Sequence, residues 1–317
     1  MIPSWIPSIL RPDYVWNPRK NLTPSSTIPP TPSPNHQIVQ RFWGHIHKHL
    51  ATFSQHYCQW MGIQFDNQII PLPFGLLLKW SDGTRLEEVL TTKVCYAAGL
   101  PTPYILSYGS HPDTPHAPMS ILMTRLPGRE LGQVYESLTP EAKTTALSEF
   151  KFYLSSIRKW KSPWGPERIC SLIGGPIRSI RVPNHTVGPC ETPKDFHDHL
   201  LAPAYNSFGS EEVFNTKLQL AKRLQTLHAN RPGVKFTHGD VKHHNFLVDD
   251  MGHITGLLDW EAAGWYPDFW EWTTAMRFVP EDFWWFDFLI ESGAGEYREE
   301  SECERALTSL TVDSYAW

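Results

Sequence analysis

Residues 237–260 read THGDVKHHNFLVDDMGHITGLLDW, and the order of polar and apolar residues in this stretch decides the fold. Two short apolar runs, Phe246–Val248 and Ile254–Leu258, predict β-strands. The sequence DDMG between them has the composition of a tight turn, so the two strands are expected to form a hairpin. A hairpin brings its two ends together, which gives the flanking polar residues a common place at one edge of a small sheet.

Three polar residues flank this hairpin. Asp240 and Asn245 precede its first strand, and Asp259 follows its second strand. Oxygen ligands of this kind suit Mg²⁺. Phosphoryl transfer uses one carboxylate to orient and deprotonate the acceptor hydroxyl, and an Asn and a second Asp to hold metal on the nucleotide phosphates. We therefore expect Asp240 to act as the base and Asn245 and Asp259 to bind Mg²⁺. The alternative is a hairpin with polar ends and no chemistry, but buried carboxylates without a cation are costly.

The stretch resembles the catalytic and metal-binding segments of the aminoglycoside phosphotransferase-like (phosphotransferase enzyme) family, especially its fungal-type members. The residues that carry the resemblance are HGD at 238–240, Asn245, ITG at 254–256 and WEAAGWYP at 260–267. The resemblance spans about residues 60–300. It implies an α+β fold of the bilobal protein-kinase type, with a small β-rich N-lobe and a larger, mostly helical C-lobe.

One departure from the family pattern lies in the catalytic loop. The family usually has His-Pro where this chain has Lys242-His243. A lysine at this position resembles the catalytic loop of protein kinases, in which it neutralises the transferring phosphate. The resemblance gives Lys242 that catalytic role, and the alternative is a solvated loop lysine.

The resemblance also points to residues for the nucleotide. An apolar strand at 73–80 ends near Lys79, and a helix at 84–98 follows, with Glu87 on its apolar side and Glu88 off it. In the family a strand lysine contacts the nucleotide phosphates and pairs with a helix glutamate, which implies Lys79 and Glu87 here. No glycine-rich loop that could hold phosphates precedes Lys79.

Residues 121–128, ILMTRLPG, resemble the family's linker between the lobes, where backbone groups meet adenine. This implies that Met123, Thr124 and Leu126 contact the nucleotide. The usual acid after the Met is replaced by Thr124, which leaves backbone contacts possible. The alternative is an edge strand that ends in a Pro-Gly turn.

Composition gives the domain organisation. Residues 1–35 form a proline-rich leader, expected to be partly disordered and partly packed on the body. The N-lobe, with the nucleotide strand and the hinge, is expected at 36–128, and the C-lobe, with the catalytic loop and the acceptor site, at 129–317. Helices are predicted at 36–56, 138–160, 194–208 and 211–230, and His197 and His199 are expected at the surface. The irregular insert 161–192, rich in Gly and Pro, is of a kind that often shapes an acceptor pocket.

Charge and cysteine content exclude several classes of protein. The net charge of −5 and the absence of a basic arm argue against a nucleic-acid partner. No apolar run reaches the roughly 18 residues of a membrane helix, and no signal peptide is evident at the start, so no membrane partner is expected. Five scattered cysteines suggest reduced thiols and a cytoplasmic location.

The function expected from these observations is ATP-dependent transfer of the γ-phosphate to a hydroxyl of a small molecule, with ATP and Mg²⁺ as cofactors. One alternative is a catalytically idle nucleotide-binding or scaffold protein of the same fold. Another is a protein substrate, suggested by Lys242, although residues 261–264 leave little room for an activation segment. The acceptor and the oligomeric state cannot be read from the sequence.

Overall fold

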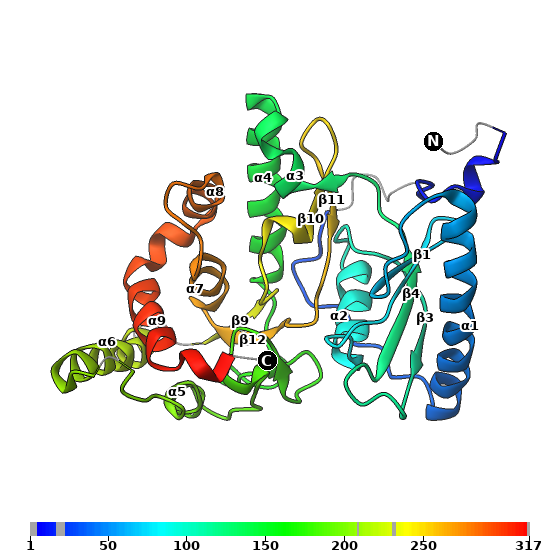
Figure 1. Ribbon diagram of the computed structural model, residues 1–317. Coiled ribbons are helices and arrows are strands. Elements are labelled where there is room, and N and C mark those ends of the chain that lie inside the picture. Colours follow the sequence, from blue (N-terminus) through cyan, green and yellow to red (C-terminus); the bar gives the residue numbers. More distant parts are fainter. Residues whose placement is uncertain (1–4, 17–22, 208, 230–232, 316–317) are drawn as a thin grey trace. The chain divides into compact units, whose positions relative to one another are not determined.

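The computed structural model describes residues 5–16, 23–207, 209–229 and 233–315, and it contains helices and strands in two compact units (Figure 1). Unit 1 comprises residues 1–24, 29–139 and 244–261, and unit 2 comprises residues 25–28, 140–243 and 262–317. The stretch that was expected to carry the chemistry is therefore divided. Asp240 and Lys242 belong to unit 2, and the hairpin with Asn245 and Asp259 belongs to unit 1.

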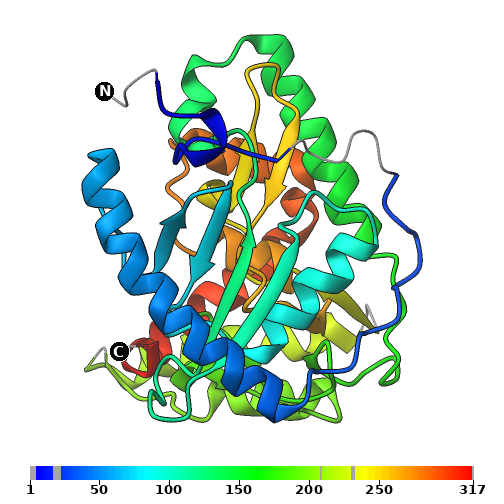
Figure 2. The same cartoon turned by 90° about the vertical axis from the view of Figure 1, so that its right-hand side faces the viewer.

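Unit 1 is built on a four-stranded antiparallel sheet with the order β1-β2-β4-β3. Its strands are β1 (Ile69–Leu72), β2 (Leu76–Lys79), β3 (Ile105–Ser110) and β4 (Met119–Thr124). Helix α1 (Gln37–Met61) lies along one face, and helix α2 (Leu86–Ala97) lies on the other side of the sheet (Figures 1 and 2). Lys79 ends β2 and is paired with Ile69 on one neighbour and Ile121 on the other, so it sits inside the sheet rather than at an edge.

Helix α1 is longer than the predicted helix at 36–56, and both its end and the start of strand β1 have a local cause. Helix α1 continues to Met61, where Gly62 in a left-handed conformation (φ 67°) ends it. Strand β1 begins only at Ile69, because Oδ1 of Asp66 accepts the backbone N–H groups of Gln68 and Ile69 and holds a turn there.

The N-terminal leader packs on unit 1 through residues 5–16. Ile6 is buried in a cluster with Tyr57, Cys58 and Met61 of α1. Trp16 donates its indole N–H to the carbonyl of Phe74 at 2.8 Å, at the tip of the β1–β2 hairpin. The expectation of partial packing is confirmed for this segment, whereas residues 1–4 and 17–22 lie outside the described residues.

The predicted hairpin is confirmed. Strands β10 (Phe246–Val248) and β11 (Ile254–Leu257) are antiparallel, and β10 also pairs with β5 (Arg129–Glu130), just ahead of the short helix α3 (Leu131–Val134). The turn between β10 and β11 requires Gly252, which has φ 82°. The amide of Leu258 donates to the carbonyl of Asn245 at 2.9 Å, so the two ends of the hairpin lie together as expected.

Unit 2 is mostly helical. Its helices are α4 (Pro140–Ile157), α5 (Pro193–Leu201), α6 (Glu211–Ala229), α7 (Trp270–Met276), α8 (Trp284–Ser292) and α9 (Arg298–Leu310). Helices α6 and α9 pack side by side (Figure 1). A small sheet has the order β6-β12-β9, from β6 (Cys170–Ser171), β12 (Gly264–Pro267) and β9 (Val234–Thr237). Strands β7 (Ile177–Arg178) and β8 (Thr186–Val187) form a separate hairpin in the irregular insert.

An aromatic core fills unit 2 and takes in one residue that was expected at the surface. His197 is 3% exposed, its ring stacks on Phe269, and its Nε2 lies 3.4 Å from Nδ1 of His228. The surface expectation is therefore wrong for His197. Helix α5 buries Phe196 and Leu200, and residue 197 is beside Phe196 on the same inward face.

Two further expectations concern thiols and membranes. The five cysteines are free thiols, as predicted, and the structure buries all of them. Among the described residues, no helix has the length and apolar character needed to cross a membrane.

Candidate active site

Lys79 is the centre of the candidate site in unit 1. Its Nζ donates to Oε1 of Glu88 at 2.8 Å and to Oδ1 of Asp259 at 2.7 Å. The lysine side chain is only 9% exposed, and that of Glu88 is 6% exposed. The contact joins the end of β2, the first turn of α2 and the residue that follows the hairpin. Unit 1 therefore brings together two residues that the sequence assigned to the nucleotide and the metal.

The glutamate in this contact is Glu88, and the prediction that Lys79 pairs with Glu87 is wrong. The prediction assumed that only one face of the helix is apolar and buried. Helix α2 instead buries residues all round, from Glu88 to Thr92 and again at Val94 and Cys95. The apolar face of the helix therefore did not identify the side that meets Lys79. Glu88 is buried on that side, and Glu87 is only partly buried.

The environment of this cluster shifts the pKa of both Lys79 and Glu88. Burial alone would lower the pKa of Lys79, but the carboxylates of Glu88, Asp259 and Glu261 outweigh it and raise the pKa above its usual range. Burial raises the pKa of Glu88 to about 7, although the adjacent lysine acts in the opposite direction. Lys79 is thus held as a cation in a site from which water is largely removed.

The donor set around Asp259 fits a hard divalent cation. Glu88, Asp259 and Glu261 each offer a carboxylate oxygen, and these oxygens lie within 4.8 Å of one another. Asp259 has φ 62°, a left-handed conformation that is uncommon for residues other than glycine and that clusters at functional sites. Asn245 is 4% exposed at the neighbouring end of the hairpin. Glu261 was not predicted; its position next to Asp259-Trp260 was the available signal.

The proposed adenine segment continues from β4. The amide of Thr124 donates to the carbonyl of Tyr104 at 3.0 Å, and Met123 is paired with Leu77 and Ile105 within the sheet. In the part of the chain that the structure describes, the amide of Leu126 has no hydrogen-bond partner. Leu126 is therefore the residue of the three whose backbone N–H is available to a ligand.

In unit 2 the loop that carries Asp240 is held by its backbone. Glu271 of α7 is fully buried and accepts the amide N–H groups of His238 and Gly239 at 2.7 and 3.0 Å. Gly239 has φ 82°, and a Cβ atom there would lie 2.3 Å from the carbonyl oxygen of Ala262. The loop consequently requires glycine at this position, which explains the residue between His238 and Asp240.

Two cations hold the carboxylate of Asp240. Arg181 donates from Nη2 and Nε to Oδ1 at 3.0 and 3.3 Å, and Nζ of Lys242 lies 3.2 Å from the same oxygen. The side chains of Arg181 and Asp240 are 9% and 10% exposed. A buried, hydrogen-bonded ion pair fixes the orientation of a carboxylate. Lys242 was predicted to lie near the chemistry, and in unit 2 it contacts the expected base.

Arg181 is a site residue that sequence reasoning missed. It lies between β7 and β8, in the insert that was expected to shape the acceptor pocket. Its carbonyl accepts from Nη2 of Arg277 at 2.9 Å, and Arg277 forms a buried ion pair with Glu304 of α9. No motif marks this arginine, because its contact with Asp240 depends on how the insert folds. The site residues thus form two groups, Lys79–Glu88–Asp259 in unit 1 and Arg181–Asp240–Lys242 in unit 2.

Comparisons with known proteins give a family match and a fold. Residues 191–299, which include Asp240, Lys242, Asn245 and Asp259, match the model of the phosphotransferase enzyme family. The match confirms the resemblance seen in the sequence. No curated protein shows significant sequence similarity to the chain.

Solved structures show the same fold. A thermostable mutant of aminoglycoside phosphotransferase APH(4)-Ia, in a ternary complex with AMP-PNP and hygromycin B, is 18% identical, with a TM-score of 0.50 over 76% of this chain and 82% of that chain. The GDP complex of aminoglycoside 2'-phosphotransferase-IIIa is 12% identical, with a TM-score of 0.50 over 86% of this chain and 88% of that chain. The chain therefore has the α+β, protein-kinase-like bilobal fold of these phosphotransferases, as predicted. The family match supports a phosphotransferase function.

Proposed function

We propose that the protein is an ATP-dependent phosphotransferase that transfers the γ-phosphate to a hydroxyl group of a small molecule. The observation that carries the proposal is the position of Lys79 between Glu88 and Asp259, at 2.8 and 2.7 Å. Burying Lys79 and Glu88 beside the partly exposed Asp259 costs desolvation energy, and replacing buried charged groups by apolar residues often stabilises a fold. A role in holding nucleotide phosphates and a metal accounts for the arrangement.

The nucleotide would be held by residues of unit 1. Lys79, oriented by Glu88, would bind the phosphates, and the backbone of Met123, Thr124 and Leu126 would meet adenine. Asn245 and Asp259 would hold Mg²⁺, with Glu261 close enough to Asp259 to share in the site. Bound Mg²⁺ neutralises phosphate charge and orients the nucleotide.

The acceptor would be handled by residues of unit 2. The carboxylate of Asp240 orients the acceptor hydroxyl and accepts its proton as the oxygen attacks the γ-phosphate. Lys242 would stabilise the charge on the transferred group. Arg181 keeps the carboxylate in one orientation and thereby reduces the entropy that the reaction must lose. The five buried free thiols accord with a reducing compartment, and we place the protein in the cytoplasm.

Thermal unfolding with ATP tests the nucleotide site first. A ligand that binds only the native state raises stability by mass action. The melting temperature should rise with ATP and Mg²⁺, rise less with ATP alone, and show no Mg²⁺-dependent rise in Asp259→Ala, each compared with the same protein without ligand. If millimolar ATP produces no shift in the natural chain, the idle scaffold becomes the better interpretation.

Turnover tests the transfer step. Release of ADP is measured with hygromycin B, gentamicin and a panel of neutral and acidic hydroxyl compounds as acceptors, with water as the acceptor in the blank. Asp240→Asn should lose transfer and keep the ATP-dependent thermal shift. Transfer at the natural rate in this variant would exclude Asp240 as the base, and transfer to peptides alone would favour a protein substrate.

A further inference from the structure

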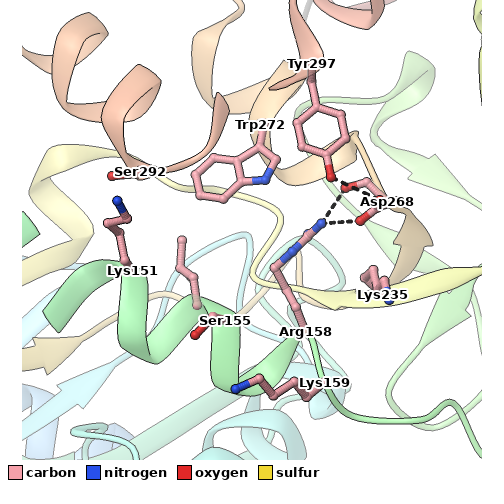
Figure 3. Close-up of a pocket in the computed structure, with 10 residues that line it drawn as sticks. Lys151, Ser155, Arg158, Lys159, Lys235, Asp268, Trp272, Ser292 and Tyr297 are labelled. Atoms are coloured by element: carbon pink, nitrogen blue, oxygen red, sulfur yellow. Dashed lines mark hydrogen bonds and ion pairs between the residues drawn. The ribbon is translucent and has the colours of Figure 1, made fainter. Parts of the chain in front are cut away.

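A second pocket lies in unit 2, lined by none of the residues that the proposed function uses. Its volume is about 340 Å³, which is within the size range of small-molecule sites. The second half of helix α4 and the turn after it form one wall, and β9 contributes Lys235. Asp268, just before α7, lines the rest with residues of α7, α8 and the 3₁₀ turn at Ala294–Tyr297 (Figure 3). The lining residues are Lys151, Leu154, Ser155, Arg158, Lys159, Lys235, Asp268, Trp272, Ser292 and Tyr297.

The floor of this pocket is fixed in place. The guanidinium group of Arg158 donates to the carbonyl of Asp268 at 2.7 Å and also forms an ion pair with its carboxylate. The hydroxyl of Tyr297 donates to Oδ2 of Asp268 at 3.0 Å, and the guanidinium of Arg158 lies over the ring of Trp272, 5.9 Å from its centroid. Figure 3 shows Arg158 and Tyr297 meeting at Asp268. The only carboxylate of the lining is thus already neutralised by Arg158.

The remaining charges of the pocket are all positive. The side chains of Lys151, Lys159 and Lys235 have no ion-pair or hydrogen-bond partner in the part of the chain that the structure describes. Lys151 lies in α4, and Lys159 lies in the turn that follows the end of α4 at Ile157. Three unpaired ammonium groups around one cavity repel one another, and the repulsion falls when an anion binds between them. This cluster occurs in a chain whose net charge is −5.

The other lining groups leave recognition of the ligand to the lysines. The hydroxyls of Ser155 and Ser292 donate to the backbone carbonyls of Phe152 and Phe288 at 2.9 and 2.6 Å, so the lysine ammonium groups are the donors that remain for a ligand. Leu154 and Trp272 are the apolar residues of the lining, and they are only 2% and 5% exposed, so a ligand would meet mainly polar groups here.

We propose that this pocket binds a small organic anion that carries at least two negative charges, of the phosphate-ester or carboxylate type. Lysine ammonium groups bind both kinds of oxyanion as point charges, so the lysines recognise the charge that the two types share. The proposal does not depend on the phosphotransferase activity, since no residue of the pocket belongs to the proposed active site.

Protection of the lysines from acetylation tests the site directly. The full chain is treated with an amine-acetylating reagent, with phenyl phosphate or citrate as the probe and sodium chloride at equal ionic strength as the blank. The modified lysines are then quantified by mass spectrometry. At a probe concentration ten times its Kd, acetylation of Lys151, Lys159 and Lys235 should slow about tenfold. Lys161, an exposed neighbour outside the lining, should react at an unchanged rate.

A double variant and a matched control make the test decisive. Lys151→Gln combined with Lys235→Gln removes two of the three unpaired charges and should abolish the protection of Lys159. Lys161→Gln removes one charge nearby and should leave that protection intact. The proposal is overturned if neither probe protects the three lysines, if Lys161 is protected equally, or if Lys159 stays protected in the double variant. Protection by phenyl phosphate alone would assign the site to phosphate esters, and protection by citrate alone to carboxylates.

Discussion

The orientation of the Asp240 carboxylate depends on one residue that the family motif does not contain. Arg181 donates two hydrogen bonds to Oδ1 and is itself held by Arg277. We expect Arg181→Met to lower kcat by roughly ten- to a hundredfold and to leave KM for ATP nearly unchanged, because a mispositioned catalytic group costs rate rather than nucleotide affinity. Steady-state release of ADP in the presence of Mg²⁺ measures both constants.

Three further variants separate this effect from a loss of folding. Arg181→Lys retains a cation and should keep more activity than Arg181→Met. Arg181→Ala should regain part of its rate when a few millimolar guanidinium is added, which a merely structural role would not produce. Arg168→Met removes an exposed ion pair with Glu191 of the same insert and serves as the control. An unchanged kcat in Arg181→Met would show that Asp240 is positioned without it.

The choice between two adjacent glutamates gives a second prediction for single residues. Glu88 contacts Lys79, and Glu87 does not take part in that ion pair. Glu88→Gln should remove most of the Mg²⁺-ATP thermal shift and lower the free energy of unfolding by roughly 1–3 kcal/mol, since it leaves a buried charge with less compensation. Glu87→Gln should retain the shift. Equal ATP-dependent shifts in the two variants would contradict the assignment of Glu88.

Glu88 and Arg181 are two site residues that the sequence did not predict, and four others were predicted for a local reason. Asp240, Lys242, Asn245 and Asp259 lie in one short stretch, where spacing and a local hairpin suffice to relate them. Glu88 depends on which side of α2 meets β2, and Arg181 depends on the fold of a long insert. Such contacts between distant parts of the chain are fixed by packing, which leaves no local signal in the sequence.

Secondary structure elements, like the site residues, were predicted where the signal is local in the chain and missed where they depend on contacts between distant segments. The β10–β11 hairpin was predicted because its turn residues are adjacent in the chain. Strand β6, in contrast, was not predicted, since it is two residues long and exists only by pairing with β12. Its residues Cys170 and Ser171 carry no strand pattern of their own. The insert therefore remained irregular in the prediction, although the structure contains three short strands there.

Helix α1 gives a prediction at the scale of one element. Its outward side exposes several apolar residues along its length, namely Ile38 (71%), Phe42 (58%), Phe53 (49%) and Trp60 (56%). Phe42→Ala should change the free energy of unfolding by less than about 0.5 kcal/mol, as for other exposed positions. Leu90→Ala in α2, at a residue that is 1% exposed, should cost about 2–5 kcal/mol. Urea unfolding measures both, and a large cost for Phe42→Ala would mean that another surface covers α1.

At the scale of the whole molecule, the sequence predicted the fold class because its strongest motif belongs to a family with one architecture. It did not predict how the chain is divided between the two units. Residues 244–261 join unit 1 because β10 pairs with β5 and Leu257 donates its amide to the carbonyl of Pro101. These contacts connect the hairpin to segments more distant in the chain than its own catalytic loop. The motif is thus continuous in sequence but shared between two compact bodies.

Both units contain a buried pair of histidines, and this gives the molecule a predictable response to acid. In unit 1, His47 and His111 both lie against the hydroxyl of Ser120, at 2.7 and 2.8 Å. In unit 2, His197 packs against His228. Burial lowers the pKa from 6.5 to about 4 for His47, to about 4 for His111, to about 3 for His197 and to about 4 for His228.

The lowered pKa values of these four histidines make the folded state less stable in acid. A histidine whose pKa is lowered by folding is neutral in the native state, so the unfolded chain takes up more protons as the pH falls below 6.5. Stability is therefore intact above pH 6.5 and is lost as the pH falls towards 4, by up to about 1.4 kcal/mol per pH unit for each group. Glu88 acts in the opposite sense, since burial raises its pKa from 4.5 to about 7. Four histidines outweigh one glutamate, and the net effect is loss of stability in acid.

Two variants of α1, two residues apart, test this expectation. His47 is fully buried, and His45 is exposed on the same helix. The melting temperature of the natural chain should fall steadily between pH 6.5 and pH 4 and vary little from pH 7 to pH 8. His47→Gln can keep hydrogen bonds to Ser107 and Ser120 but takes up no proton, so its decline in acid should be shallower. His45→Gln should decline like the natural chain, because it leaves the buried histidines in place. Parallel declines in the two variants would show that buried histidines do not set the acid limit of the fold.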